Sequence, residues 1–456
     1  MNRLNRLLDR MFTTDQMEWP KLRSMFLTLV LDQFFIFFIG MLSTALVSSV
    51  GEAAIAAVSM VGTVNGMVSL VFSSLASGGA LVVARAKGRN DPDGIRRTIG
   101  EVTGLCGTVA TVLSVLLYVF AGSIVNLLYP SVEPLLTEYA VRYMRMMAIS
   151  FIPFSVFNAI FCIFRNLGDT RSSLFLTIAI NVTHLLLSLL FINGLGMGVS
   201  GSGLAYILAR LLGMGLALLW ILRFANHYGV VWKDFFHFRR STTREILSLG
   251  MPMTVESLLM QGGMLLVQVY LAGLTTTDLA AHAVANSILN LYNTTAGALV
   301  TISGTVCGQC FGAGRQDLVR KYCYGLIRAG RFVLLATVLL LYPLTPLLLQ
   351  LYNATPEGAA IIYRALRIAA VAMPLLYCDA YIPAIVLRVV GDSMFVSTVS
   401  VLGLAMGRCL LGYLLTVPAG LGVIGIWIGM AVEWFLRALA LRIRTKGRLA
   451  DKAAPG

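Results

Sequence analysis

Charged side chains are scarce in this chain. Only 12% of its 456 residues are Asp, Glu, Lys or Arg, whereas soluble domains carry about 25%. Hydrophobic residues make up 58%, and apolar runs of the roughly 20 residues that cross a bilayer recur throughout. A transmembrane β-barrel would show short alternating segments instead. These features exclude a large soluble domain and predict a polytopic helical membrane protein.

Motifs that would carry enzymatic or nucleotide chemistry are also missing. There is no GxxxxGK phosphate-binding pattern, no HExxH zinc pattern and no pair of Asp-rich segments for a prenyl diphosphate. The pair Cys307 and Cys310 has CxxC spacing but no second pair, so we interpret it as small apolar filler. The start of the chain lacks the pattern of a cleaved signal peptide. We therefore expect neither an enzyme nor a metal or organic cofactor.

The net charge of +14 has an uneven distribution. Lys and Arg cluster before the first predicted span, in every second connection and after the last span. The intervening connections carry no Lys or Arg, only acids such as Glu52, Glu133 and Asp278. This positive-inside pattern predicts a plasma (inner) membrane protein with both termini in the cytoplasm. The basic balance indicates topology and attraction to membrane lipid, and no nucleic acid is expected as a partner.

The sequence contains an internal duplication. A shift of 224 positions (279 − 55) places Ile55-Ala56-Ala57 on Leu279-Ala280-Ala281 and Asp32 on Glu256. Six spans are predicted in each half, so the halves share one orientation. The twelve predicted spans are residues 25–49, 53–83, 98–122, 139–163, 172–193, 199–222, 247–273, 278–306, 325–349, 360–387, 394–416 and 421–441.

The predicted fold is therefore all-α and membrane-integral, with twelve helices in two homologous six-helix lobes. Residues 1–222 form the N-lobe with a surface helix at its start, and residues 247–456 form the C-lobe with a basic tail. Residues 223–246 form a cytoplasmic linker that mixes aromatic side chains with Lys and Arg. That mixture suits an interfacial helix that tethers the lobes and lets them move.

Four carboxylates lie inside predicted spans and away from the span ends: Asp32, Glu256, Asp379 and Glu433. A charge at mid-bilayer costs roughly 3 kcal/mol, so such groups usually face a cavity or a partner. Glu256 and Asp379 have similar predicted depths, and they could share a proton or hold Na⁺. A polar cluster that only packs helices is the alternative. For Glu433, a structural pair with Arg437 at i,i+4 spacing is favoured.

Other polar groups are candidates to line a cavity. Asn286, Asn290 and Asn293 share one helix face, which either joins helices or lines a wet cavity. Tyr377 and Tyr381 are oxygen donors near Asp379. The remaining candidate is Gln261, on the span of Glu256. Three prolines should bend the spans beside the acids, as proline frees carbonyls in helices: Pro252, Pro374 and Pro383.

These motifs resemble the multidrug and toxic compound extrusion (MATE) family over nearly the whole chain. The matching stretches are Gly250–Glu256, Asp278–Asn286, Gly308–Gly314, Leu387–Asp392, Arg408–Leu415 and Gly422–Met430. The resemblance implies a V-shaped pair of six-helix lobes around a central cavity. It also implies that Glu256 and Asp379 resemble the cation site of the C-lobe. Family members often have an acid in a V-D-T pattern late in the first span, where this chain has Leu42-Ser43-Thr44. An N-lobe proton site, if one exists, must use Asp32.

The resemblance further implies a secondary antiporter that exports cationic or amphipathic drugs in exchange for inward H⁺ or Na⁺. Alternating access of the two lobes would perform this exchange, with Glu256, Asp379 and Asp32 as the residues that couple to the cation. The expected partners are small organic cations and membrane lipid, and the expected state is a monomer because one chain supplies both lobes. The alternative within the same superfamily is a lipid-linked saccharide flippase.

Overall fold

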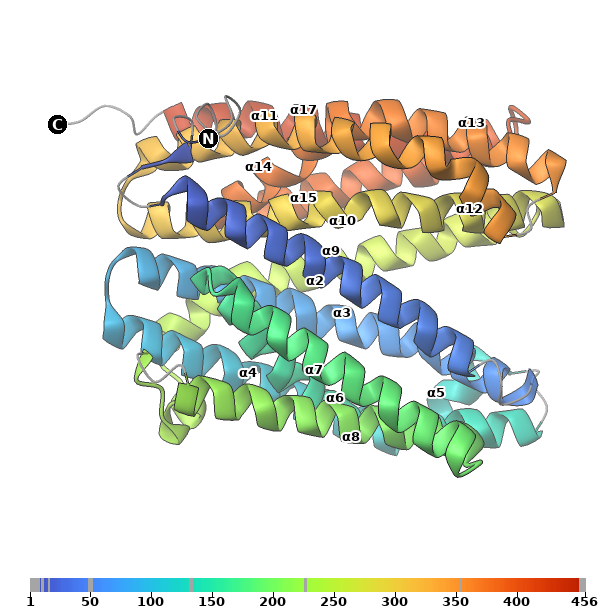
Figure 1. The fold of residues 1–456 in the computed structure, drawn as a ribbon, viewed down its shortest axis with the longest axis horizontal. Coiled ribbons are helices and arrows are strands. Elements are labelled where there is room, and N and C mark those ends of the chain that lie inside the picture. The colour runs from blue at the N-terminus through green and yellow to red at the C-terminus, as the bar shows by residue number, and fades with distance from the viewer. Residues whose placement is uncertain are drawn as a thin grey trace. The chain divides into compact units, whose positions relative to one another are not determined.

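The computed structural model of this chain describes residues 9, 12–14, 17–47, 52–130, 134–224, 228–352 and 355–450. Within these ranges the regular structure is entirely helical, as predicted from composition. The long helices are α2 (Trp19–Val47), α3 (Glu52–Gly88), α4 (Pro92–Val119), α6 (Pro134–Leu167), α7 (Thr170–Ser188), α8 (Gly198–Leu219), α9 (Arg240–Leu271), α10 (Thr276–Gly312), α11 (Gln316–Leu341), α13 (Pro356–Ala372), α14 (Cys378–Val389), α15 (Ser393–Gly403) and α17 (Val423–Ala450) (Figure 1).

Short elements complete or join these helices. The short α-helices are α5 (Ala121–Leu128), α12 (Thr345–Leu351) and α16 (Gly412–Thr416). In the described part of the chain, four π-helical turns extend or connect long helices: η2 (Leu189–Gly194), η3 (Trp220–Phe224), η7 (Met373–Tyr377) and η8 (Leu404–Leu411). The 3₁₀ turns are η5 (Trp232–Phe236) and η6 (Tyr342–Leu344). Turns of these two kinds often mark functional hinges or strained sequence inside helices.

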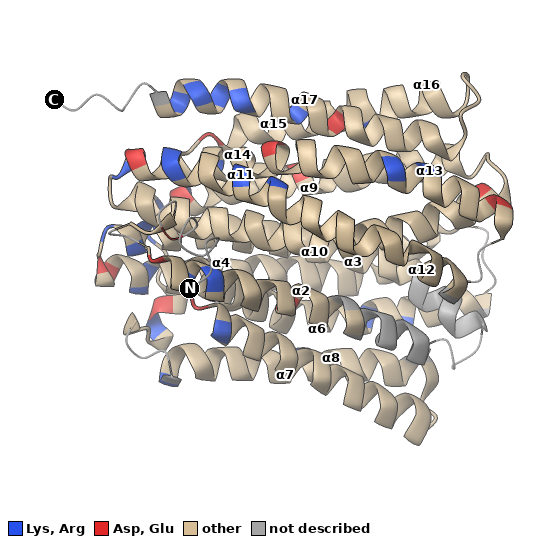
Figure 2. Ribbon diagram, turned by 45° about the horizontal axis from the view of Figure 1, so that its top comes forward, with Lys and Arg blue, Asp and Glu red and all other residues tan. Residues whose placement is uncertain are grey.

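Nine helical stretches within the described ranges are long and apolar enough to cross a membrane. Each of them overlaps one predicted span. The other three predicted spans fall on α2, α9 and α10, which have 29, 32 and 37 residues. The twelve-span prediction is consistent with this architecture. Apart from Arg437, the Lys and Arg residues of α17 lie in its last turns, beyond the apolar part of the helix (Figure 2).

The chain divides into two compact units. One contains residues up to Val30 and from Val255 onward, and the other contains Leu31–Thr254. Both divisions fall inside a helix, α2 and α9, and they lie 224 residues apart (255 − 31), the same as the repeat offset. The first helix of each repeat therefore belongs partly to each unit. The six-helix lobe boundaries proposed from the sequence stay a prediction.

Backbone geometry repeats between the halves. Gly168 and Gly391 have φ values of +80° and +95° at the ends of α6 and α14, where a left-handed residue closes each helix. Asp169 then caps α7 by accepting a hydrogen bond from the Ser172 amide at 3.2 Å. In the unit Leu31–Thr254, α3 and α9 cross so closely that a Cβ on Gly78 would lie 2.5 Å from the Cα of Gly250.

The linker between the halves differs from the interfacial helix that we expected. Between the described residues of η3 and α9 lies the 3₁₀ turn η5, which packs on α4 in the unit Leu31–Thr254. The helix that follows, α9, begins at Arg240 and so includes the last predicted linker residues. The turn is capped at its start, where Asp234 accepts a hydrogen bond from the Val231 amide at 2.8 Å.

Candidate functional site

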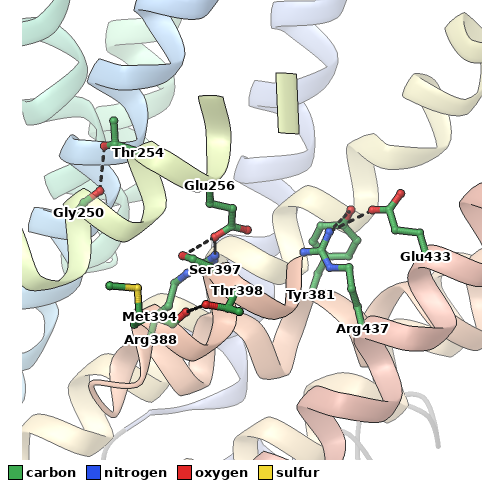
Figure 3. Close-up of polar contacts among 10 residues, drawn as sticks. All are labelled: Gly250, Thr254, Glu256, Tyr381, Arg388, Met394, Ser397, Thr398, Glu433 and Arg437. Atoms are coloured by element: carbon green, nitrogen blue, oxygen red, sulfur yellow. Dashed lines mark hydrogen bonds and ion pairs between the residues drawn. The ribbon is translucent and has the colours of Figure 1, made fainter. Parts of the chain in front are cut away.

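Glu256 lies on α9 and meets two other helices. Its carboxylate accepts hydrogen bonds from the Arg388 guanidinium on α14 and from the Ser397 hydroxyl on α15, the latter at 2.8 Å (Figure 3). Glu256 is 8% exposed, and Arg388 is similarly buried. A buried carboxylate without such partners would be strongly destabilising, so the three residues act as one unit. Any proton or cation that neutralises Glu256 competes with Arg388 for it.

Asp32 makes the corresponding contact in the first half. It lies on α2, is fully buried, and accepts a hydrogen bond from the Arg165 guanidinium on α6. The same guanidinium stacks over the Phe161 ring, with its central carbon 4.4 Å from the ring centroid. The second carboxylate oxygen of Asp32 has no hydrogen-bond partner among the described residues. The Thr177 side chain on α7 also interacts with the Asp32 carboxylate.

The two pairs are equivalent by sequence. Arg165 and Arg388 begin the repeated pattern R-x-x-G-D at the ends of α6 and α14. Their partners Asp32 and Glu256 stand next to the points where α2 and α9 pass from one unit to the other, after Val30 and Thr254. We had not predicted these arginines as partners. The repeated pattern could have indicated them, because both copies keep the arginine beside a buried acid.

Asp379 has a different partner. Both of its oxygens accept hydrogen bonds from Arg331 on α11, at 2.8–3.0 Å. Asp379 and Arg388 lie in the first and last turns of α14, roughly 13 Å apart along the helix axis. The structure therefore does not bring Glu256 and Asp379 together, and no bond joins them among the contacts of the described residues. A Na⁺ site shared by both carboxylates stays a prediction. In this structure each carboxylate is instead bound to its own arginine.

Glu433 on α17 is the fourth buried acid. Its i,i+4 contact with Arg437, at 3.4 Å, confirms the pair that we predicted. A second arginine, Arg408 of η8, lies 2.8 Å away through its Nε, although the two groups are not aligned as a hydrogen bond. The contact is therefore an ion pair without a hydrogen bond. Glu433 is fully buried, so the two arginines support a structural role.

The two tyrosines near Asp379 belong to this arginine cluster. Tyr377 and Tyr381 stack with ring centroids 4.2 Å apart, and Arg437 lies over the Tyr381 ring at 4.5 Å. The Tyr381 hydroxyl accepts a hydrogen bond from Arg437 at 3.4 Å (Figure 3). Just before them, Pro374 lies in the π turn η7, as expected of a residue that lacks an amide N–H. In this arrangement the Tyr381 oxygen is a hydrogen-bond acceptor for Arg437.

Of the three asparagines on the predicted face, Asn286 lines a cavity. Asn286 lines a small cavity of ≈ 20 Å³ with His282 and Arg408, within the unit that contains α10 and α17. That volume admits about one water molecule, and the three side chains could bind it. Asn286 and Asn290 are both exposed, and Asn293 is half-buried on the same helix. The cavity residues are Met264, Val267, His282, Asn286, Leu289, Arg408, Ile426, Trp427 and Met430.

Two positions from the sequence analysis have less structural detail. Gln261 is half-buried on α9. Ser43 stands in α2, where the family often has an acid, and its side chain lies outside the described residues. His282, Arg331 and Ser397 were not among our candidates. The sequence carried only a weak signal for them, because each becomes noticeable through a partner on another helix.

Comparison with known proteins identifies relatives over almost the whole chain. A family model described as MatE matches residues 29–190 and again 252–414, and the second match begins 223 residues after the first (252 − 29). "Uncharacterized transporter YisQ" of Bacillus subtilis is 20% identical over 98% of this chain and 96% of its own. "Probable multidrug resistance protein NorM" of Thermotoga maritima is 23% identical over 88% of this chain and 86% of its own.

Solved structures share the fold. The chain described as MATE in complex with MaL6 superposes with a TM-score of 0.88 at 17% identity, covering 99% of each chain. An outward-facing multidrug resistance transporter of the MOP superfamily superposes with a TM-score of 0.86 at 18% identity, covering 95% of this chain and 96% of its own. The repeated match of one family model agrees with the internal duplication read from the sequence, and the candidate spans agree with a membrane-integral chain.

Proposed function

Since the chain belongs to the MATE family of transporters, we propose that it is a secondary antiporter that exports cationic or amphipathic organic compounds. Inward H⁺ or Na⁺ drives the export through alternating access of the two halves. The names of the NorM relatives favour drug efflux over flipping of a lipid-linked saccharide. The single observation that carries the coupling proposal is the buried Glu256, which is held between Arg388 and Ser397.

The mechanism begins with the charge of Glu256. While the carboxylate is ionised, it holds α14 and α15 against α9. A proton or Na⁺ on Glu256 removes the attraction for Arg388, so the cation favours a state in which these helices separate. A cationic substrate favours the other state, because it gains an ionised partner there. Differential affinity of this kind is what any ligand needs to shift a conformational equilibrium.

The position of Glu256 supports this role. Glu256 stands beside the point where α9 passes from one unit to the other, and Asp32 stands at the equivalent point of α2. We therefore assign Asp32 a matching coupling role in the first half, with Arg165 as its partner. Asp379 would couple through Arg331, and Asn286, Asn290, Asn293, Tyr377, Tyr381 and Gln261 would line the substrate path.

Efflux in vesicles tests the proposal. Glu256→Gln should abolish uphill export of a cationic dye, while the amount of folded protein in the membrane stays the same. Glu357→Gln is the matched control, because Glu357 is an exposed acid in the first turn of α13. Undiminished uphill export by the Glu256→Gln variant would remove this residue from the mechanism.

A double variant separates coupling from simple packing. If Glu256 only compensates Arg388, Glu256→Gln combined with Arg388→Gln should restore export, because neither buried group is then left unpaired. If Glu256 carries the coupling cation, the double variant folds as well as the wild type and still fails to export uphill. We expect the second result.

The same proposal covers location and assembly. Both termini lie in the cytoplasm and the chain spans the plasma (inner) membrane, following the positive-inside pattern of its connections. A single chain supplies both halves, so it works as a monomer surrounded by lipid. The proposed lobes are residues 1–222 and 247–456, joined by the linker 223–246.

A further inference from the structure

The turn η5 is seated on α4 through two glycines. A Cβ on Gly104 would lie 1.9 Å from the backbone oxygen of Phe235, and one on Gly100 would lie 2.5 Å from that of Asp234. Only glycine allows this approach, so α4 carries a groove shaped for the linker. The contact lies wholly within the unit Leu31–Thr254.

Charge pairs hold the turn in its seat, which is the surface of α4 at Gly100 and Gly104. Arg96 of α4 donates to both carboxylate oxygens of Asp234, at 2.8 and 3.2 Å. Burial raises the pKa of Asp234, but the hydrogen bonds from Arg96 and from the Val231 amide outweigh it, so the pKa lies below its ordinary value. Thr243, at the start of α9, donates to Glu101 of α4 at 3.3 Å. The linker is therefore attached to α4 at several points.

The aromatic side chains of residues 231–240 differ in what they contact. Phe235 is 5% exposed on this seat, and the ring of Phe238, 46% exposed, also reaches it, because a Cβ on Gly104 would lie 3.3 Å from that ring. Trp232 and Phe236 are 59% and 79% exposed. Lys233, Arg239 and Arg240 are exposed beside them. Exposed aromatic rings among cations are typical of segments that lie in the headgroup region of a membrane.

The depth of the seat on α4 agrees with that interpretation. The charged residues of α4 end at Glu101, and the rest of the helix, Val102–Val119, contains no charged residue. Gly104 therefore stands just inside the apolar part of a helix that is long enough to cross the membrane. A turn seated at Gly100 and Gly104 lies where headgroups give way to acyl chains.

We propose that residues 231–240 form a membrane-interface anchor that inserts Trp232 and Phe236 into the leaflet on the basic side of the protein. The occupant of this surface is anionic lipid, because Lys233, Arg239 and Arg240 match the charge of its phosphates. The anchor fixes the start of α9 relative to the membrane. It thereby sets the depth of the helix that carries Glu256.

Collision measurements on a spin label test the anchor. The full chain with Phe236→Cys is labelled with a nitroxide and placed in nanodiscs of phosphatidylcholine and phosphatidylglycerol. Label at Val112→Cys, 55% exposed on the apolar part of α4, is the lipid control, and label at Asp93→Cys, in the first turn, is the water control. The parent chain, treated in the same way, supplies the background from its native cysteines.

The expected result is a label at position 236 that oxygen reaches as readily as at position 112, with several-fold fewer collisions with a water-soluble nickel chelate than at position 93. A label that behaves like the one at position 93 would overturn the proposal. So would a label shielded from both reagents, because protein would then cover the surface. Replacing Lys233, Arg239 and Arg240 by Gln should raise the nickel collision rate in these nanodiscs, and an unchanged rate would contradict the role of anionic lipid.

The seat on α4 gives an independent test of position. Gly104→Ala should displace η5 and raise the nickel collision rate of the label at position 236. Gly107→Ala on the same helix is the matched control, because its Cβ would meet only Val156, at an ordinary 3.4 Å. Equal collision rates in the two variants would mean that the seat does not hold the turn at the interface.

Discussion

At the scale of single residues, buried carboxylates and arginines have to be considered as pairs. Removing one partner of a buried pair leaves an unpaired charge and typically costs about 3–5 kcal/mol, whereas removing both costs much less. Asp32 and Glu256 are both held in this way, by Arg165 and Arg388. The acids that couple transport in our proposal are therefore also structural, and stability must be measured alongside function.

Arg165→Gln should lower the thermal unfolding temperature strongly, because it leaves the fully buried Asp32 without its guanidinium. Asp32→Asn combined with Arg165→Gln should recover most of that loss. Thermal unfolding of the purified proteins in one detergent checks both expectations. An equal loss in the single and double variants would show that Asp32 does not need Arg165.

Asp392, in the connection between α14 and α15, makes stability depend on pH. Burial raises its pKa, but the hydrogen bond from Arg444 and the charges of Arg444 and Arg448 prevail, so its pKa lies below the ordinary 3.8. A depressed carboxylate pKa stabilises the folded state above the unfolded pKa, and this stability disappears as pH falls through the folded pKa. Asp392→Asn should therefore melt earlier than the wild type at neutral pH.

The same difference in melting temperature should shrink below about pH 4, because protonated Asp392 no longer attracts Arg444 and Arg448. Asp278→Asn is a useful control, since Asp278 is an acid in the first turn of α10 with no arginine partner among the described contacts. A difference that is constant from neutral to acid pH would contradict the role of Asp392 in an ion pair.

At the scale of elements, close packing depends on a few glycines. Gly78→Ala should destabilise the chain, because the added Cβ would lie 2.5 Å from the α9 backbone at Gly250. Gly66→Ala, also on α3, has nothing within 4 Å of the added Cβ, so it should be neutral or stabilise the helix by about 1 kcal/mol. Opposite shifts in unfolding temperature are expected, and a stabilised Gly78→Ala variant would contradict the crossing.

Helices could be predicted from the sequence far better than their partners. Apolar runs of spanning length fix where helices form, since the backbone must satisfy its hydrogen bonds internally in lipid. The extensions of helices beyond the spans, such as α9 starting at Arg240, are polar and carry no such signal. The 3₁₀ turn of the linker was missed for a similar reason, because its conformation depends on the glycine seat and on Arg96, far away in the sequence.

At the scale of the whole molecule, the duplication is the feature that sequence, structure and family comparison share. It predicted the equivalence of Asp32 and Glu256, and each acid makes the corresponding contact with the arginine of an R-x-x-G-D pattern. Depth arguments alone indicated that Glu256 and Asp379 could meet, whereas in the structure each has its own arginine partner, Arg388 and Arg331. Span depth gives one coordinate, whereas the identity of a partner also depends on the rotation of each helix.

The most direct test of the account is the cation movement itself. In proteoliposomes that contain the purified protein, an imposed gradient of a cationic substrate should drive H⁺ or Na⁺ in the opposite direction, measured with a pH-sensitive dye and with radioactive sodium. The account predicts substrate-driven cation movement in the wild type and its loss in Glu256→Gln, with substrate binding retained. Substrate-driven cation movement of normal size in Glu256→Gln would contradict the account.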